Sequence, residues 1–322
     1  MTQSMWHASG SNATLIRELA VIFGILLIAI FGIVVGLTLF SLRRRHRSLP
    51  QETLERLHQA SAGTEAKLRT AVAIATGITV LILFGLTVVS ISVGKIVSAS
   101  MAPAGSLTIE VTGAQWWWKI RYANDDPSRI LQTANEIHIP VGQSIAIRGN
   151  SGDVIHSFWV PSLQGKRDLI PGQPTYEWLQ ADRPGEYRGQ CAEFCGLQHA
   201  HMAFWVIAEP ADRFNAWMDH QLEPAMEPAD EQSRRGREVF LKAACVLCHA
   251  IRGTGAGAQI GPDLTHFGSR KTIAAGTLVN TKGNLAGWIA DPQNIKPGTH
   301  MATVPIQPAE MQPLIDYLES LR

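Results

Sequence analysis

Two long apolar segments without charged side chains, 19–42 and 70–94, dominate the first hundred residues of the chain. A helix over either segment spans about 36 Å at roughly 1.5 Å per residue, enough to cross a hydrocarbon core of about 30 Å. The first segment is longer than the apolar part of a cleaved signal peptide, and it ends in Arg43-Arg44-Arg45. The pattern therefore predicts a hairpin of two transmembrane helices.

The basic residues around these segments predict how the hairpin is oriented. The connection 43–69 carries seven Lys and Arg residues against three Glu residues, whereas the tail 1–18 offers only Arg17. By the positive-inside rule the connection is cytoplasmic, so both termini lie on the periplasmic side of a bacterial plasma membrane. Because two helices alone seldom form a functional membrane unit, we expect a larger membrane partner in addition to lipid.

From about 105 to 210 the pattern changes to short alternating segments separated by Gly and Pro turns. Strands this short, without a helical period, are typical of an all-β sandwich or barrel. The predicted strands are Leu107–Val111, Trp116–Tyr122, Glu136–Ile139, Ser144–Arg148, Val154–Val160, Thr175–Gln180, Glu186–Gly189 and Ala203–Ile207.

A helical period returns after the strands. Residues 211–232 are predicted as a short helix followed by a Pro/Ala/Glu linker. In the last segment, 233–322, Val239 and Phe240 share one helical face, and Ala309–Leu321 is predicted as a closing helix. The segment is therefore expected to form an all-α domain.

Charge argues against a nucleic-acid partner, and the cysteines indicate metal or cofactor sites. The chain has 28 Lys and Arg residues against 27 Asp and Glu residues, so no nucleic-acid partner is expected. Its four cysteines form two close pairs, Cys191 with Cys195 and Cys245 with Cys248. Disulfides are one interpretation for an exported domain, but each pair is followed by His residues, which favours metal or cofactor chemistry.

The first cysteine pair lies in a segment that also contains His199 and Met202. Thiolate, imidazole and thioether ligands suit copper, and His156 on a predicted strand can supply a second imidazole. Two thiolates can bridge two copper ions and leave one His for each, which predicts a binuclear centre. A zinc site would leave Met202 unused, and thioredoxin-like copper carriers require a βαβ pattern.

The second pair, Cys245-Val-Leu-Cys248-His249, is the C-x-x-C-H attachment signature of a c-type haem. Its thiols are expected to hold the haem covalently, and His249 is expected to bind the iron.

The sixth iron ligand is predicted to be Met301, which lies in a Pro/Gly loop. A methionine ligand raises the haem potential, whereas the rival residues His266 and His300 would lower it. Met311 is a further rival, but it falls in the predicted closing helix.

At the copper-binding segment the sequence resembles subunit II of the haem–copper cytochrome c oxidases, with its copper-A cupredoxin domain. The resemblance includes Val154–Pro161, Gly165–Gly172 and the aromatic segment Gly113–Trp118, and it covers about residues 15 to 220. It implies six copper ligands: His156, Cys191, the Glu193 carbonyl, Cys195, His199 and Met202.

The same resemblance assigns three further roles. The Glu193 carboxylate would reach a magnesium ion shared with subunit I. Trp116 would be a surface aromatic through which an external donor delivers electrons, and His201 would be a bystander because the copper site is already full. One departure concerns Glu65. In the family, the Glu at the entrance of a proton path is followed by a Trp and a Pro, and the segment after Glu65 contains neither. Whether Glu65 lies on a proton path therefore stays open.

The C-terminal segment resembles the class I cytochromes c. Pro262 matches the proline whose carbonyl orients the axial histidine, and Trp288 matches the indole that donates to a haem propionate. The usual Met-Pro pair is Met301-Ala302 in this chain, a minor departure.

A subunit II fused to a cytochrome c is the arrangement of caa-type oxidases. The resemblance implies electron transfer from cytochrome c or a quinol–cytochrome c reductase, through haem c and copper A, to oxygen reduction in subunit I, coupled to proton translocation. Subunits I and III are the implied partners. The alternatives are a nitric oxide reductase with a similar copper subunit, a quinol oxidase subunit, which lacks the copper ligands, and a copper carrier without haem.

Overall fold

The computed structural model describes residues 3–45, 62–99 and 105–322, so most of the predicted connection 43–69 lies outside the described residues. The chain divides into two compact units. One covers Leu15–Ala99, and the other joins Met1–Thr14 to Ser100–Arg322.

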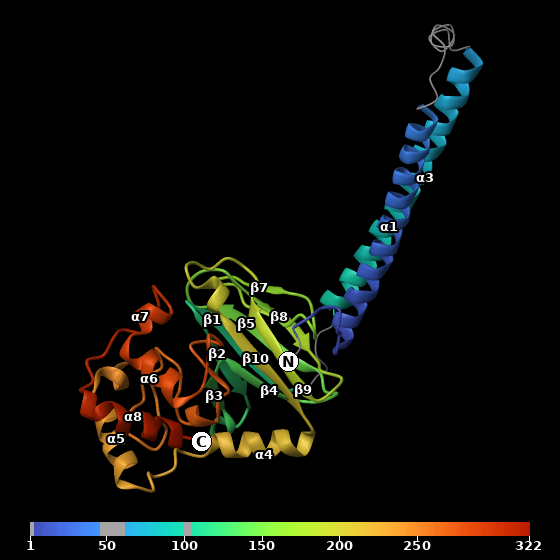
Figure 1. Cartoon of the computed structure of the whole chain (residues 1–322). Coiled ribbons are helices and arrows are strands. Elements are labelled where there is room, and N and C mark those ends of the chain that lie inside the picture. The colour runs from blue at the N-terminus through green and yellow to red at the C-terminus, as the bar shows by residue number, and fades with distance from the viewer. Residues whose placement is uncertain (1–2, 46–61, 100–104) are drawn as a thin grey trace. The chain divides into compact units, whose positions relative to one another are not determined.

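The first unit is built from two long helices, α1 (Ser11–Arg45) and α3 (Ala62–Ala99) (Figure 1). Within the described residues, Ser11–Arg43 and Gly63–Ser98 are long and apolar enough to cross a membrane. Beyond the first turns of α1, most of their apolar side chains are exposed, as at Phe31. Both helices extend beyond the predicted apolar segments. Polar residues at their ends also support a helix: Glu65 and Arg69 form an (i, i+4) ion pair of 3.2 Å.

Two five-stranded sheets face each other in the second unit and confirm the predicted all-β sandwich, which we call the β domain. The first sheet has the order β3-β2-β1-β5-β8 and the second β4-β10-β9-β6-β7. Pairing is antiparallel except between β1 and β5 and between β4 and β10. The strands are β1 Thr108–Ala114, β2 Trp117–Ala123, β3 Leu131–Ala134, β4 Glu136–Pro140, β5 Ile145–Ser151, β6 His156–Trp159, β7 Arg167–Leu169, β8 Thr175–Leu179, β9 Gly185–Cys191 and β10 Ala203–Glu209.

Alternation of buried and half-buried residues along β1 and β2 places one side of each strand in the core. There Trp118 packs edge-on against Phe158 and Phe204. The pattern did not predict β3 and β7, because strands of three or four residues are too short for a period of two to be recognised.

Residues around Ser9 pack on the β domain. The Ser9 amide donates to the Ser162 carbonyl at 2.7 Å, and the Asp182 amide donates to the Ser9 carbonyl at 2.7 Å. Further on, the Ala13 amide donates to the Leu163 carbonyl at 3.2 Å. These main-chain bonds hold the segment just before the first membrane helix against the sandwich.

Helix α4 (Ala211–Leu222) follows the last strand and closes one end of the β domain (Figure 1). Its Trp217 stacks on His138 with ring centroids 4.0 Å apart, and Phe214 and Met218 belong to the core of the sandwich. The helix predicted at the start of 211–232 is therefore part of the β domain's packing.

The remaining residues form a helical C-terminal domain with its own core, as the sequence predicts. Helix α5 begins after Asp230, whose carboxylate accepts from the Ser233 amide at 2.8 Å. It packs against α8, where Phe240 faces Tyr317. The elements are α5 Glu231–Lys242, β11 Thr272–Ile273, β12 Leu278–Val279, α6 Lys282–Ala290, α7 Pro292–Ile295 and α8 Pro308–Ser320.

Candidate copper and haem sites

The loop between β9 and β10 brings the first set of predicted ligands together. Cys191 ends β9, and its amide donates to the Met202 carbonyl at 3.0 Å, which closes the loop at its base. A short 3-10 helix, His199–His201, turns His199 inward and His201 outward. Adjacent antiparallel strands thus fix both ends of a segment that holds five of the six predicted donors.

The donor atoms converge around the two thiols, whose sulfurs lie 3.8 Å apart and are not bonded. One imidazole approaches each sulfur: His156 Nδ1 lies 3.9 Å from Cys191 Sγ, and His199 Nδ1 lies 3.6 Å from Cys195 Sγ. The remaining donors are also close, with the Glu193 carbonyl 3.2 Å from Cys191 Sγ and Met202 Sδ 3.9 Å from Cys195 Sγ. A pair of soft thiols, each with its own imidazole, suits copper.

His156 reaches this loop from β6, a different part of the sandwich. Its ring is fully buried, and Nε2 lies 2.7 Å from Asp153 Oδ1, which leaves Nδ1 facing the thiols. Gly113 on β1 permits the approach, because a Cβ there would lie 2.7 Å from the ring. Burial lowers the pKa of His156, but its hydrogen bonds to Cys191 and Asp153 outweigh burial and leave the pKa above its usual value.

The two thiols have opposite proton affinities. The hydrogen bond between the two side chains lowers the pKa of the Cys191 thiol to about 3 and raises the pKa of the Cys195 thiol. One member of the pair is therefore a thiolate near neutral pH, ready to bind a soft metal ion.

Replacing Asp153 with asparagine should weaken copper binding by roughly 10–100-fold, the usual cost of losing a group that orients a metal-binding histidine. The carboxylate fixes the tautomer of His156 through the bond to Nε2. Competition titration with a copper chelator measures the effect. Asp125→Asn, at an exposed turn residue, is the matched control, and equal affinities for the two variants would disprove the orienting role.

A second set of predicted residues meets at a cavity of about 420 Å³ in the C-terminal domain. Cys245 and Cys248 line it from a 3-10 turn, Ala244–Leu247, and the His249 amide donates to the Cys245 carbonyl at 3.0 Å. Apolar side chains make up most of the remaining wall, including Trp288. A largely apolar cavity with both thiols and an imidazole on its wall fits a covalently held haem.

The imidazole of His249 is held in place by its neighbours. The Pro262 carbonyl accepts from Nδ1 at 2.8 Å, which directs Nε2 away from this bond. A Cβ at Gly261 would lie 2.8 Å from the ring, so glycine leaves room for it. Burial lowers the pKa of His249, so the imidazole is neutral near pH 7, the form that binds a metal.

Met301 and His300 both line the cavity, whereas the other two rivals are engaged elsewhere. His266 turns Nδ1 to the Arg322 carbonyl at 2.9 Å and Nε2 to the Glu223 carbonyl at 3.1 Å. Met311 packs on the helical core. The ring of His300 lies beside Trp116, with centroids 6.0 Å apart, so Met301 remains the favoured sixth ligand.

Comparison with known families agrees with this geometry. Residues 124–209 match the family described as cytochrome c oxidase subunit II, periplasmic domain, and residues 233–322 match the cytochrome c family. A subunit II periplasmic domain is thus followed by a cytochrome c domain. The first match contains every predicted copper ligand, and the second contains the predicted haem ligands.

Several relatives share the subunit II name. The chain is 42% identical over 215 residues to cytochrome c oxidase subunit 2 of Alkalihalophilus pseudofirmus, covering 66% of this chain and 61% of that protein. It is 31% identical over 228 residues to cytochrome c oxidase subunit 2 of Bacillus subtilis, covering 67% and 63%. The chain thus spans just over three fifths of the length of these curated relatives.

A solved structure is also similar in sequence to part of the chain. It is the periplasmic domain of subunit II of cytochrome oxidase from Bradyrhizobium japonicum, with 30% identity and a TM-score of 0.35. The similarity covers 38% of this chain and 96% of that one.

The structure corrects the expectation that Trp116 is a surface residue of the subunit II domain. Its side chain is only 6% exposed, because the cytochrome c domain covers it at Gly298 and His300. Its indole Nε1 donates to the Cys195 carbonyl at 3.0 Å, and the residue also lines the haem cavity. An external donor therefore cannot touch Trp116 in this arrangement.

Glu193 and His201 lie at the rim of the copper loop. The Glu193 side chain is 42% exposed and lies 4.0 Å from Lys166, so its carboxylate is accessible to a further ligand. His201 directs Nδ1 to Gln198 Oε1 at 2.8 Å, away from the thiols.

The sequence did not predict the role of Lys296, a residue of the cytochrome c domain that lies where this domain contacts the copper loop. Its side chain is only 2% exposed and reaches the copper loop. Nothing in the local sequence indicated this, because a lysine in a Pro/Gly loop is ordinarily exposed.

Proposed function

We propose that this chain is the electron-transfer subunit of a terminal respiratory cytochrome c oxidase. It accepts electrons at a haem c held by Cys245, Cys248 and His249 and passes them through a two-copper centre at Cys191 and Cys195. The acceptor is the oxygen-reducing centre of a membrane partner, and the reaction is coupled to proton translocation. The observation that carries the proposal is the convergence of six copper donors on one loop, in the same compact unit as the haem cavity.

The protein's contribution to the copper centre is a rigid, water-poor set of ligands. Cys191, Cys195 and Met202 are buried, and the strands β9 and β10 fix the loop at both ends. A copper pair bound there would supply one-electron transfer with little change in geometry. Fixed ligands favour such transfer because little reorganisation accompanies each change in charge.

The residues that would hold the haem iron are His249, whose imidazole is held in one tautomer, and Met301, whose thioether lines the same cavity. Pro262 orients His249, and we assign Met301 as the second axial ligand and Trp288 as the haem propionate donor. Tethering this donor to the copper domain replaces a diffusional encounter by one at an effective concentration of about a millimolar or more.

The membrane arrangement follows from the two long apolar helices. Their outward-facing apolar side chains require lipid or another membrane protein, and we assign subunit I as the main partner and subunit III as a second. Both termini and both cofactor domains are placed on the periplasmic side. The exposed Glu193 carboxylate is assigned to a magnesium ion shared with subunit I.

Purification of the intact chain from membranes tests the proposal. We expect two copper ions and one covalent haem per chain, a co-purifying haem–copper subunit, and oxygen uptake driven by reduced cytochrome c. Metal analysis, the haem absorption of the denatured chain and an oxygen electrode measure these results. One copper or none, or no covalent haem, would contradict the proposal. Consumption of nitric oxide in place of oxygen would show that the complex is a nitric oxide reductase.

A further inference from the structure

The cytochrome c domain contacts the copper loop through two short segments. The first is the turn between β11 and β12, where the Ala275 carbonyl accepts from the Ala203 amide at 2.9 Å. The second is Lys296-Pro297, here called the docking segment, where the Pro297 carbonyl accepts from Gln198 Nε2 at 2.7 Å. Ala203 and Gln198 directly flank the copper-binding residues His199 and Met202.

Lys296 is the central residue of this contact. Its ammonium donates to the carbonyls of Trp116 at 2.7 Å, His201 at 2.7 Å and Ala274 at 3.0 Å. The first two acceptors belong to the subunit II domain and the third to the cytochrome c domain. Burial lowers the pKa of Lys296 to about 7, while three carbonyls match the three N–H donors of the charged form. Burying such a cation costs free energy unless each of its donors has an acceptor. Two of the three acceptors belong to the subunit II domain, so the side chain of Lys296 is satisfied only when the two domains are in contact.

The turn that receives Lys296 has a strained backbone. Ala274 and Ala275 have φ values of 52° and 56°, in a region that residues with a Cβ rarely adopt. This conformation presents the carbonyl of Ala274 to Lys296 and that of Ala275 to Ala203. Strain of this kind persists where surrounding contacts hold it, and here the contacts come from the other domain.

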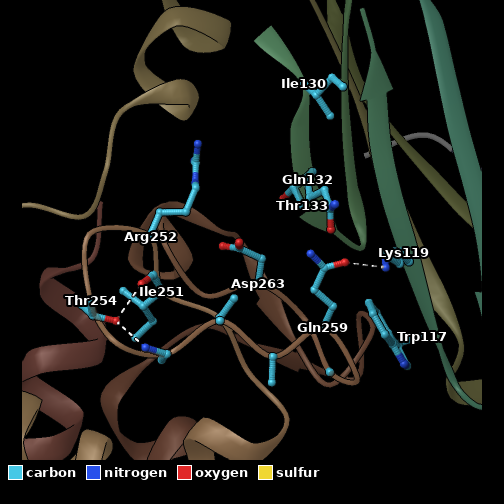
Figure 2. Close-up of a pocket in the computed structure, with 15 residues that line it drawn as sticks. Trp117, Lys119, Ile130, Gln132, Thr133, Ile251, Arg252, Thr254, Gln259 and Asp263 are labelled. Atoms are coloured by element: carbon cyan, nitrogen blue, oxygen red, sulfur yellow. Dashed lines mark hydrogen bonds between the residues drawn. The ribbon is translucent and has the colours of Figure 1, made fainter. Parts of the chain in front are cut away.

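Another part of the contact between the two domains encloses a cavity. Figure 2 shows a polar cavity of about 370 Å³ lined by Trp117, Lys119 and Thr133 on one side and by Gln259 and Asp263 on the other. The bond drawn across it, from Lys119 Nζ to Gln259 Oε1, measures 3.5 Å. Beside this cavity the Lys271 amide donates to Glu136 Oε1 at 2.7 Å, and Arg270 donates to Thr133 Oγ1 at 3.4 Å. These bonds hold the domains together away from the copper loop, whereas the docking segment acts at the copper loop itself.

We propose that the docking segment fixes the cytochrome c domain against the copper loop, with Trp116 enclosed between the haem cavity and Cys195. The inference rests on the proposed function, since it explains how the chain's own haem becomes the sole entry for electrons. Lys296 is a positioning residue: its side chain borders the haem cavity, and its hydrogen bonds hold that cavity against the copper loop. Without it, the contact at the copper loop loosens and Trp116 becomes more accessible.

The test compares Lys296→Met with Lys282→Met in the intact, cofactor-loaded complex. Methionine keeps most of the apolar stem of the side chain, one atom shorter, and removes its three donors, whereas Lys282 forms surface ion pairs with Asp316 and Glu319 of its own domain. We expect amide exchange at Ala203 to accelerate at least about tenfold in Lys296→Met, since hydrogen bonds from a charged group contribute appreciably. Haem-to-copper transfer after flash reduction should slow by at least about tenfold too, and the haem spectrum checks that the introduced methionine does not bind the iron.

A second variant serves if Lys296→Met fails to attach haem. Gln198→Leu removes the bond to Pro297 from the subunit II side and leaves the cytochrome c sequence intact. It should accelerate exchange at Ala203 by about threefold. Wild-type exchange and transfer rates in the variants would overturn the docking proposal. Absence of haem-to-copper transfer in the wild type, with exchange still dependent on Lys296, would instead overturn the proposed function and leave docking supported.

Discussion

Replacing Cys191 with serine should abolish the copper-derived visible absorption and reduce oxygen uptake at least about a hundredfold. The estimate follows because even groups that merely orient a metal ligand contribute 10–100-fold, and Cys191 is itself the low-pKa thiol of the pair. Its sulfur lies within 4 Å of Cys195, His156 and the Glu193 carbonyl, so no other side chain takes its place. Copper content and the visible spectrum of the purified complex measure the loss.

His201→Ala is the control for this experiment. The imidazole lies in the same loop but bonds to Gln198 Oε1 and is exposed, so its removal should leave two copper ions and full turnover. Loss of copper from the His201 variant, or retention of the pair by the Cys191 variant, would show that the ligand set is wrong.

Replacing Met301 with histidine should lower the potential of the haem by on the order of 0.1 V or more, within the span of about 0.8 V that axial ligands set. At about 59 mV per factor of ten for one electron, this shift moves the haem–copper equilibrium by roughly fiftyfold toward oxidised haem and reduced copper. Reduction of the haem by its external donor would become less favourable by the same factor, and turnover would fall where this step limits the rate. Redox titration of the haem absorption measures the potential.

Met311→Leu separates the two methionines. Met311 packs on the helical core, where leucine conserves volume, so the haem potential should stay at its wild-type value. A potential shift in the Met311 variant together with none in the Met301 variant would assign the sixth ligand to Met311.

Local spacing explains why so much of the copper loop could be predicted. Cys191, Cys195, His199 and Met202 lie within one loop between paired strands, so their separation along the chain sets their separation in space. The same holds for the C-x-x-C-H segment, whose 3-10 turn places both thiols on one wall of the cavity. Hydrophobic pattern likewise determined the two membrane helices, the sandwich and the helical domain, because each has a distinct period.

Contacts between distant segments were decided only by the tertiary structure. The ring of His156 reaches the copper loop because Gly113 leaves space for it and Asp153 orients it. The separation of these residues along the chain predicts neither contact. Trp116 was expected at the surface because its own strand carries no sign of the domain that covers it. That domain follows more than a hundred residues later, and its docking depends on Lys296, which bonds across 180 residues of sequence to the Trp116 carbonyl.

The chain's sequence thus determined which donors exist and which elements carry them. Tertiary structure decided their partners: the carbonyls that receive Lys296, the carboxylate that orients His156 and the cover over Trp116. The physical reason is that local periodicity and short loops act over a few residues, whereas burial and hydrogen-bond satisfaction are properties of the whole packed unit.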